Sequence, residues 1–142
     1  MAEFSYAKGR INESLRYIAS EIKEFESDYS ARSWQDYQND AKLQKLMDRT
    51  VENILTALIE ICGTIAAEKG IAAENYSEVL LKAAQLFGFS ENEQRELAKL
   101  AAQRNRLAHR YLDLKWQAIK MFNDHKKLVH KLLEKILSSE NK

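Results

Sequence analysis

The sequence predicts an all-α protein, an antiparallel helical bundle of four main helices with one or two short ones. The 142 residues include no proline and only four glycines, so little interrupts a helix. Apolar residues make up 45% and charged residues 30%, which is typical of a folded globular chain rather than a disordered one. Apolar positions recur at steps of three and four, the spacing of one helix face. This length favours one domain over residues 1–142.

The first half of the chain predicts three helices. Residues 9–26 carry a helical apolar stripe formed by Ile11, Leu15, Ile18, Ile22 and Phe25. The polar stretch SDYSARS predicts a loop, and a short helix is expected at 34–38. A long helix is expected over 40–69, ending at Gly70, the usual residue just past a helix end. About thirty residues at about 1.5 Å each make a rod of roughly 45 Å, so part of it is expected to pack against a second subunit.

The second half predicts a short helix and two longer ones. Asn75 and Glu78 mark the start of the short helix, which Gly88 closes. Ser90 and Glu93 form a capping box that opens the next helix, and this helix carries the stretch RNRLAHRY at 104–111. The last helix is expected over 115–137. Its apolar side is formed by Trp116, Ile119, Phe122, Leu128 or Val129, Leu132, Leu133 and Ile136.

Composition excludes several classes of protein. The net charge of +1 excludes a polycation, so any contact with nucleic acid has to come from a local patch. Cys62 is the one cysteine, which excludes a disulfide scaffold and a cysteine metal site within one chain, and a buried position is expected for it. The N-terminus lacks the apolar core of a signal peptide, and the most apolar stretch, 54–67, is too short to span a bilayer. We therefore expect a cytoplasmic protein without a membrane segment.

Motifs for other chemistries are also missing from the sequence. It has no glycine-rich phosphate loop, no G-x-S-x-G and no paired metal-ligand spacing. His125 and His130 are five residues apart, which does not suit the i, i+4 spacing of a two-histidine metal site. Both histidines are expected to face solvent, and no metal or cofactor is expected.

Arg104 occupies a position where the pattern of its helix predicts an apolar residue. The stripe runs through Leu97, Leu100 or Ala101, position 104, Leu107 or Ala108, and Tyr111. Burying an unpaired guanidinium costs several kcal/mol, so a folded protein pairs it, hydrates it or uses it. One interpretation is that Arg104 extends to solvent or pairs with a carboxylate of the long helix, such as Glu52 or Glu60. The other is that it belongs to a functional site.

Asn105 and His109 are four residues apart and would be neighbours on one helix face. The asparagine could then hydrogen-bond one imidazole nitrogen and fix the tautomer of a general acid or base. Arg104 and His109 are separated by about 140° around an ideal helix, so they do not converge. Either the helix loosens before His109, or another copy of the motif completes the pair. The second alternative predicts a dimer with this helix at its two-fold axis.

The pattern Arg104-Asn105-x-x-x-His109-x-Tyr111 resembles the R-x4-H-x-Y signature of the HEPN superfamily, and specifically the HepT-like toxins paired with minimal nucleotidyltransferase antitoxins. In that superfamily a polar residue follows the arginine, and Asn105 fits. The W-x-x-Y turn at 34–37, the long third helix and the terminal helix also fall in the expected order. The resemblance therefore covers most of the chain.

The resemblance implies the toxin of a type VII-like toxin–antitoxin pair, a metal-independent ribonuclease that needs no cofactor. In that scheme His109 deprotonates the ribose 2′-OH or protonates the leaving 5′-oxygen, and Arg104 binds the scissile phosphate. Asn105 orients the histidine or the RNA. The resemblance also implies a homodimer whose two motifs face each other. A nucleotidyltransferase antitoxin would attach AMP to Tyr111, which would block the RNA cleft.

Alternatives remain for the chain and for single residues. The chain could be a non-catalytic helical module that binds a nucleotidyltransferase partner or a nucleotide, or a plain dimeric scaffold. The intact set of Arg104, Asn105 and His109 favours the ribonuclease, because an adaptor has no need of it. Tyr111 could simply end the helix with a packed ring. Arg106, Arg110 and the lysines of the last helix predict a solvated face more than an RNA track.

Overall fold

A computed structural model describes residues 2–140, and the side chains of 10–140. Its helices are, in order, α1 (Ala2–Asp28), α2 (Trp34–Gln38), α3 (Ala41–Glu68), α4 (Tyr76–Leu86), α5 (Glu91–Leu107) and α6 (Leu112–Glu140). Residues 2–140 contain no strand, so the predicted all-α class is confirmed.

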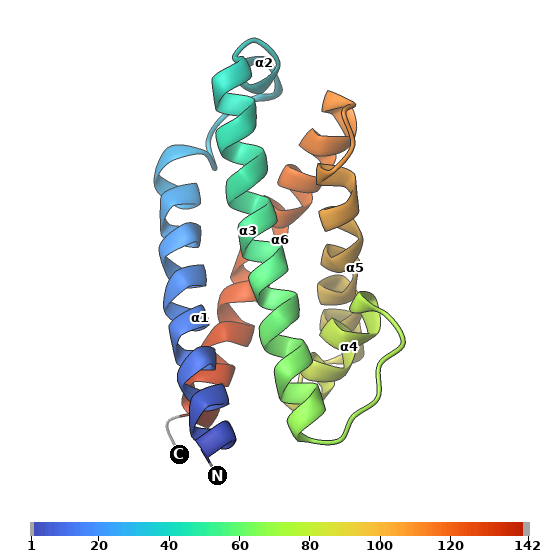
Figure 1. The fold of residues 1–142 in the computed structure, drawn as a ribbon. Helices are drawn as coiled ribbons and strands as arrows, with labels where there is room; N and C mark the ends of the chain where they lie inside the picture. Colours follow the sequence, from blue (N-terminus) through green and yellow to red (C-terminus); the bar gives the residue numbers. More distant parts are fainter. Residues whose placement is uncertain (1, 141–142) are drawn as a thin grey trace.

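Four long helices run alternately up and down, and the two short helices lie beside them (Figure 1). In this view α1 and α3 lie in front, α6 runs behind them and α5 stands at the right. The short α4 packs on the lower part of α5, and α2 caps the upper end of α3. The connection between α5 and α6 lies at the end of the bundle opposite to the start of α1 and the end of α6.

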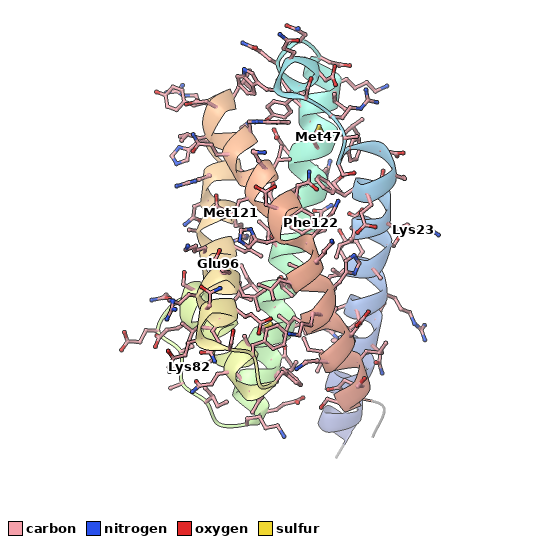
Figure 2. All side chains as sticks on the ribbon, turned by 180° about the vertical axis from the view of Figure 1, so that it is seen from behind. Lys23, Met47, Lys82, Glu96, Met121 and Phe122 are labelled. Carbon is pink, nitrogen blue, oxygen red and sulfur yellow. The ribbon has the colours of Figure 1, made fainter. Side chains whose placement is uncertain are left out.

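The core forms where the apolar stripes of these helices meet. The stripe predicted for α1 is buried from Ile11 to Phe25. The ring of Phe25 meets Phe122 of α6 edge-on, with centroids 5.1 Å apart. Seen from behind in Figure 2, Phe122 lies on the inner side of α6, whereas its neighbour Met121 lies toward α5. The exposed Lys23 points away from the bundle, as the helical alternation requires.

The most apolar helix, α3, is long and apolar enough to cross a membrane by length and composition alone. The expectation that its apolar stretch is too short is therefore not supported. However, 61% of the apolar window is buried inside the bundle, against α1, α4, α5 and α6. Burial of this kind is what the central helix of a bundle requires, and no membrane protein is indicated.

Local capping explains most of the helix boundaries. The Ser90 hydroxyl accepts from the Glu93 amide, and the Glu93 carboxylate accepts from the Ser90 amide, which confirms the predicted capping box. Asn75 caps α4 by accepting from the Glu78 amide. After α4 the chain turns at Gly88, with a φ of 79° that favours glycine.

Several helix limits differ from the prediction, including both ends of the first and of the last helix. The first helix begins at Ala2 rather than near residue 9, and the last begins at Leu112 rather than 115. The most important difference is the end of α5 at Leu107, four residues before Tyr111. Neither glycine nor proline marks this end, so no local sequence signal predicted it.

An aromatic cluster joins α2 to the first turns of α6, close in sequence to the end of α5. The ring of Trp116 lies 5.9 Å from Trp34 and 5.4 Å from Tyr37. The buried hydroxyl of Tyr37 donates to Asp48 Oδ1 at 2.6 Å, and Lys115 Nζ lies 3.5 Å from the other carboxylate oxygen. Burial raises the pKa of Asp48, although Tyr37 and Lys115 oppose that shift. These contacts fix the W-x-x-Y turn on the α5–α6 end of the bundle.

Candidate active site

Arg104 lies one turn before the end of α5 and turns toward α3. It is partly buried, and its Nε–H donates to Thr56 Oγ1 at 2.9 Å. Its guanidinium carbon lies 5.8 Å from the ring centroid of Tyr76, the first residue of α4. Within residues 10–140 Arg104 makes no ion pair, so the expected pairing with Glu52 or Glu60 is wrong. A hydroxyl group and an aromatic face replace the carboxylate.

Two adjoining cavities share Arg104, Thr56 and Glu60 as walls. The larger, about 520 Å³, lies between α1 and α3 and is lined by Glu13, Ser14, Tyr17, Glu52, Asn53, Thr56, Ala57, Glu60 and Arg104. The smaller, about 220 Å³, lies between α3 and α4 and is lined by Thr56, Ile59, Glu60, Gly63, Tyr76, Val79 and Arg104. Thr56 therefore holds the Nε of the guanidinium, and the same group borders two cavities that are open to solvent. Such an arginine is placed to bind an anion without first releasing a carboxylate.

His109 and Tyr111 lie in the connection after α5, not on the helix. The last turn closes with the Ala108 amide on the Asn105 carbonyl and the His109 amide on the Arg106 carbonyl. The side chains of Asn105 and His109 are exposed, and the Tyr111 ring is 61% exposed. The alternative in which Tyr111 packs its ring at the helix end is therefore wrong. The first of the two alternatives for Arg104 and His109 requires the helix to loosen before the histidine, and α5 does end before His109.

The expected hydrogen bond between Asn105 and His109 is not formed. It required both residues on one helical face, and α5 ends between them. Among the described residues no hydrogen bond or ion pair joins Arg104 to His109 either: the arginine turns to α3, and the exposed imidazole lies in the connection. A single protomer thus presents a positioned cation and an accessible general acid or base as separate groups.

Sequence reasoning missed three residues near this segment. Thr56 and Tyr76 contact Arg104 from 48 and 28 residues away, so no pattern within one helix could reveal them. Gln103 is only 3% exposed. Its amide nitrogen donates to the Lys99 carbonyl, and its oxygen accepts from Arg106 Nη1. The Arg106 side chain is therefore partly held by Gln103, whereas Arg110 is exposed as predicted.

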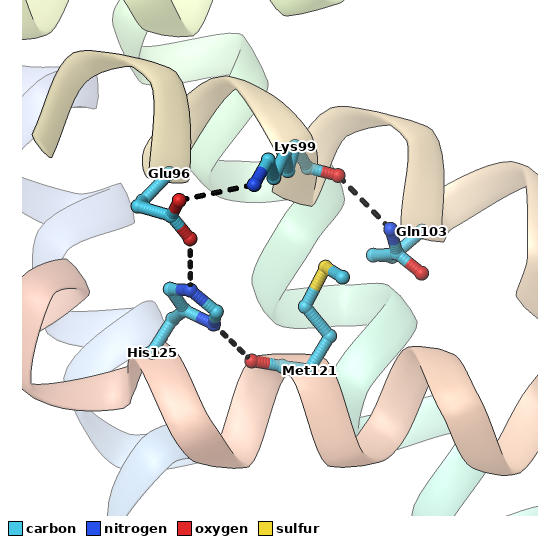
Figure 3. Close-up of polar contacts among 5 residues, drawn as sticks. All are labelled: Glu96, Lys99, Gln103, Met121 and His125. Atoms are coloured by element: carbon cyan, nitrogen blue, oxygen red, sulfur yellow. Dashed lines mark hydrogen bonds and ion pairs between the residues drawn. The ribbon is translucent and has the colours of Figure 1, made fainter. Parts of the chain in front are cut away.

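The prediction that His125 and His130 face solvent is wrong for His125. Its side chain is 21% exposed and sits between α6 and α5 (Figure 3). Nδ1 lies 2.7 Å from the Met121 carbonyl and Nε2 lies 2.7 Å from Glu96 Oε2. This contact, with that of Lys99, lowers the pKa of Glu96. His130, with 43% exposure, contacts Glu26 of α1 at 2.8 Å, so both histidines join helices.

Other reactive groups do not form a second centre. Cys62 is fully buried, as predicted, and burial raises the pKa of its thiol to about 12. Between residues 10 and 140, no group of three or more His, Cys, Asp or Glu side chains is placed to hold a metal ion. Lysines of α6 are partly engaged: Lys131 pairs with Glu93, and Lys135 donates to the Phe87 carbonyl.

The all-α fold is the one expected of a HEPN-type protein, and the segment with Arg104, His109 and Tyr111 lies at the α5–α6 junction. A family model described as Ribonuclease HepT-like matches residues 15–136. The match includes all of segment 104–111, and the chain belongs to this HepT-like ribonuclease family. No curated protein matches the sequence.

Proposed function

We propose that the chain is a metal-independent endoribonuclease, the toxin of a type VII-like toxin–antitoxin pair, acting as a single-domain homodimer in the cytoplasm. Family membership supports an RNA-cleaving enzyme of the HEPN type. One observation carries the assignment of its site: the Arg104 guanidinium is held by a hydroxyl rather than a carboxylate, so its charge is available to a phosphate. The exposed His109 follows five residues later, free of any competing partner in the described chain.

In the proposed reaction His109 accepts the proton of a ribose 2′-OH. The 2′-oxygen attacks the adjacent phosphorus, the bond from phosphorus to the 5′-oxygen breaks, and a protonated imidazole supplies the proton to that leaving oxygen. The products are a 2′,3′-cyclic phosphate and a 5′-hydroxyl, and no water is consumed. Arg104 binds the scissile phosphate and stabilises the charge that develops on it. Asn105, exposed on the last turn of α5, orients the RNA or the imidazole.

Two protomers are proposed to complete the site, because Arg104 and His109 of one chain turn to different places. In a two-fold dimer, Arg104 of one protomer can face His109 of the partner subunit across the same groove. Mixing Arg104→Ala and His109→Ala protomers would then restore activity. About half of randomly formed dimers contain one protomer of each kind, and one of the two sites in such a dimer has both Arg104 and His109, so about a quarter of all sites are intact. Failure of the mixture to regain any activity would contradict a shared site.

The decisive test compares histidine variants in an RNA cleavage assay. His109→Ala is expected to lose at least about a hundredfold in cleavage, the usual contribution of general acid–base catalysis, and to remain folded and dimeric. His130→Ala is the matched control, because it removes an imidazole from α6 without touching segment 104–111. Unchanged cleavage by His109→Ala would overturn the nuclease assignment. A tight complex with a nucleotidyltransferase and no cleavage by the free protein would support the adaptor instead.

Regulation by AMP addition is proposed at Tyr111. Its exposed hydroxyl would attack the α-phosphate of ATP within a cognate minimal nucleotidyltransferase antitoxin, with release of pyrophosphate. The added phosphate places negative charge and bulk beside the residues proposed to bind RNA. Mass spectrometry after co-expression is expected to find AMP on the wild type and not on Tyr111→Phe. Tyr76→Phe, which removes another exposed phenol, serves as the control.

A further inference from the structure

The smaller cavity beside Arg104 has no role in the proposed reaction. It lies on the α4 side of the arginine, whereas the larger cavity lies on the α1 side. One wall is a cation, one is the carboxylate of Glu60, and one is the ring of Tyr76. A hollow with these three kinds of wall matches the parts of a nucleotide: a phosphate, a hydrogen-bonding base edge and a flat base.

Tyr76 has the placement of a stacking platform. Its ring is 54% exposed although it begins a helix packed against α3 and α5. The Arg104 guanidinium lies over one face of the ring, 5.8 Å from its centroid, so the base of a nucleotide whose phosphate binds the arginine would stack on the other face. Exposed aromatic rings beside cations are a usual device for holding unpaired bases.

Gly63 lines this cavity without a side chain that would fill it. It lies inside α3, where glycine is a poor helix former, and its φ is not in the left-handed region. A Cβ built there would meet only Val79 Cγ1, at an ordinary 4.0 Å. Neither the backbone nor the packing requires glycine at this position. The consequence of its missing side chain is free space in the cavity that Tyr76 also lines.

Glu60 supplies an acceptor in the same cavity. The side chain is exposed and makes no ion pair with Arg104, so its oxygens are available to a ligand. An ionised carboxylate only accepts hydrogen bonds, and its two oxygens suit an edge with two adjacent N–H donors. Guanine has such an edge in its N1–H and N2–H groups. Adenine instead presents an acceptor beside one donor on the equivalent edge.

We propose that the cavity is a guanine pocket: the base stacks on Tyr76 in the space that Gly63 leaves, its donor edge faces Glu60, and the phosphate attached to its ribose lies against Arg104. This inference rests on the proposed function in taking that phosphate to be the scissile one in RNA. A free guanosine nucleotide carries the same chemistry, and the two sources are separated by the experiments below.

The first experiment measures binding of 5′-GMP, 5′-AMP and ribose 5-phosphate to the full chain by isothermal titration calorimetry. We expect 5′-GMP to bind most tightly and ribose 5-phosphate, which has no base, most weakly. Tyr76→Ala is expected to weaken 5′-GMP binding by roughly 5- to 100-fold, the range of a lost base–aromatic stack, and Tyr76→Phe to retain it. Glu60→Gln is expected to bring the affinities for 5′-GMP and 5′-AMP together. Equal affinity of the wild type for all three ligands would overturn the pocket.

Gly63 provides a second perturbation, and a Cβ at this position meets no clash. Gly63→Ala adds a methyl group where space exists and favours the helix, and Gly63→Leu fills the cavity further. Weaker 5′-GMP binding in the order glycine, alanine, leucine is expected, while circular dichroism stays unchanged. An alanine or leucine variant that binds 5′-GMP as well as the wild type would show that the base does not enter here.

The second experiment separates the pocket from the nuclease. Short RNAs with guanine or adenine beside one cleavable phosphate are compared, and guanine is expected to be cleaved faster by the wild type but not by Glu60→Gln. If His109→Ala loses cleavage while Tyr76→Ala keeps both cleavage and base preference, the pocket is overturned and the proposed function stands. If the wild type cleaves nothing but binds 5′-GMP through Tyr76, the pocket stands and the ribonuclease does not.

Discussion

Thr56→Val tests whether the hydroxyl under Arg104 positions the arginine for its proposed work. Valine has the same shape, so it removes the acceptor of the 2.9 Å hydrogen bond without opening a cavity. A hydrogen bond to a charged group contributes about 1.5–3 kcal/mol, and partial exposure of Arg104 favours the lower value. A loss of about 1.5 kcal/mol in the transition state corresponds to a roughly tenfold lower kcat/KM.

The cost to the free energy of unfolding is expected to be smaller than the cost to activity. Without Thr56 the guanidinium can turn to solvent, so Thr56→Val is expected to lose at most about 1 kcal/mol of stability, or about 2–4 °C in Tm. Thr64→Val is the matched control. Its hydroxyl, also on α3, donates only to the Glu60 carbonyl of its own helix. RNA cleavage and thermal unfolding are measured for both variants.

The positioning role also predicts rescue by the conservative change. Thr56→Ser keeps the acceptor and is expected to retain most of the activity, although serine at this site has more rotamers than threonine. The reasoning is refuted if Thr56→Val cleaves as well as Thr64→Val, or if Thr56→Ser loses as much activity as Thr56→Val.

Three further predictions concern stability. Tyr37→Phe removes the buried donor to Asp48 and is expected to cost about 2 kcal/mol in urea unfolding, and a loss below about 0.5 kcal/mol would contradict it. Hydrogen bonds from Lys131 and from the Ser90 amide lower the pKa of Glu93 to about 2. The ionised carboxylate therefore stabilises the fold above its unfolded-state pKa, and this contribution to the free energy of unfolding is lost as pH falls from about 5 to 2. Glu93→Gln keeps the cap, so its free energy of unfolding is expected to fall less than that of the wild type across this pH window. An equal dependence on pH in the two proteins, measured by acid titration, would contradict this. Gly88→Ala places a side chain at a φ of 79° and is expected to destabilise by about 1 kcal/mol, whereas Gly63→Ala should stabilise by up to about 1 kcal/mol in the same urea assay.

The sequence predicted the helices well because burial of an apolar stripe is a local pattern. The stripe from Ile11 to Phe25, the cap at Ser90 and the buried Cys62 are all confirmed. Helix ends without a marker were predicted less well. Ala108 follows α5 without a glycine or proline, and the helix stops there because the chain must turn into α6. Such a stop depends on packing between helices rather than on residues near it.

The partners of charged groups could not be predicted, since they depend on how helices rotate against each other. One interpretation paired Arg104 with Glu52 or Glu60, one turn either side of the Thr56 that it contacts. His125 was expected in solvent, and its glutamate partner lies 29 residues earlier on α5. The motif residues themselves were visible in the sequence because they are close together. Their surroundings were not, because these come from α3 and α4.

The start of α1 and the end of α6 lie at one pole of the bundle, and the connection between α5 and α6 lies at the other (Figure 1). The 29 residues of α6 separate the two poles by about 43 Å at 1.5 Å per residue. An affinity tag, a fluorophore or a surface linker attached at the start of α1 or at the end of α6 would thus sit far from the junction within the same protomer. Protein immobilised through that pole would keep its junctions on the side away from the surface, which suits single-molecule and surface-plasmon measurements with RNA in solution.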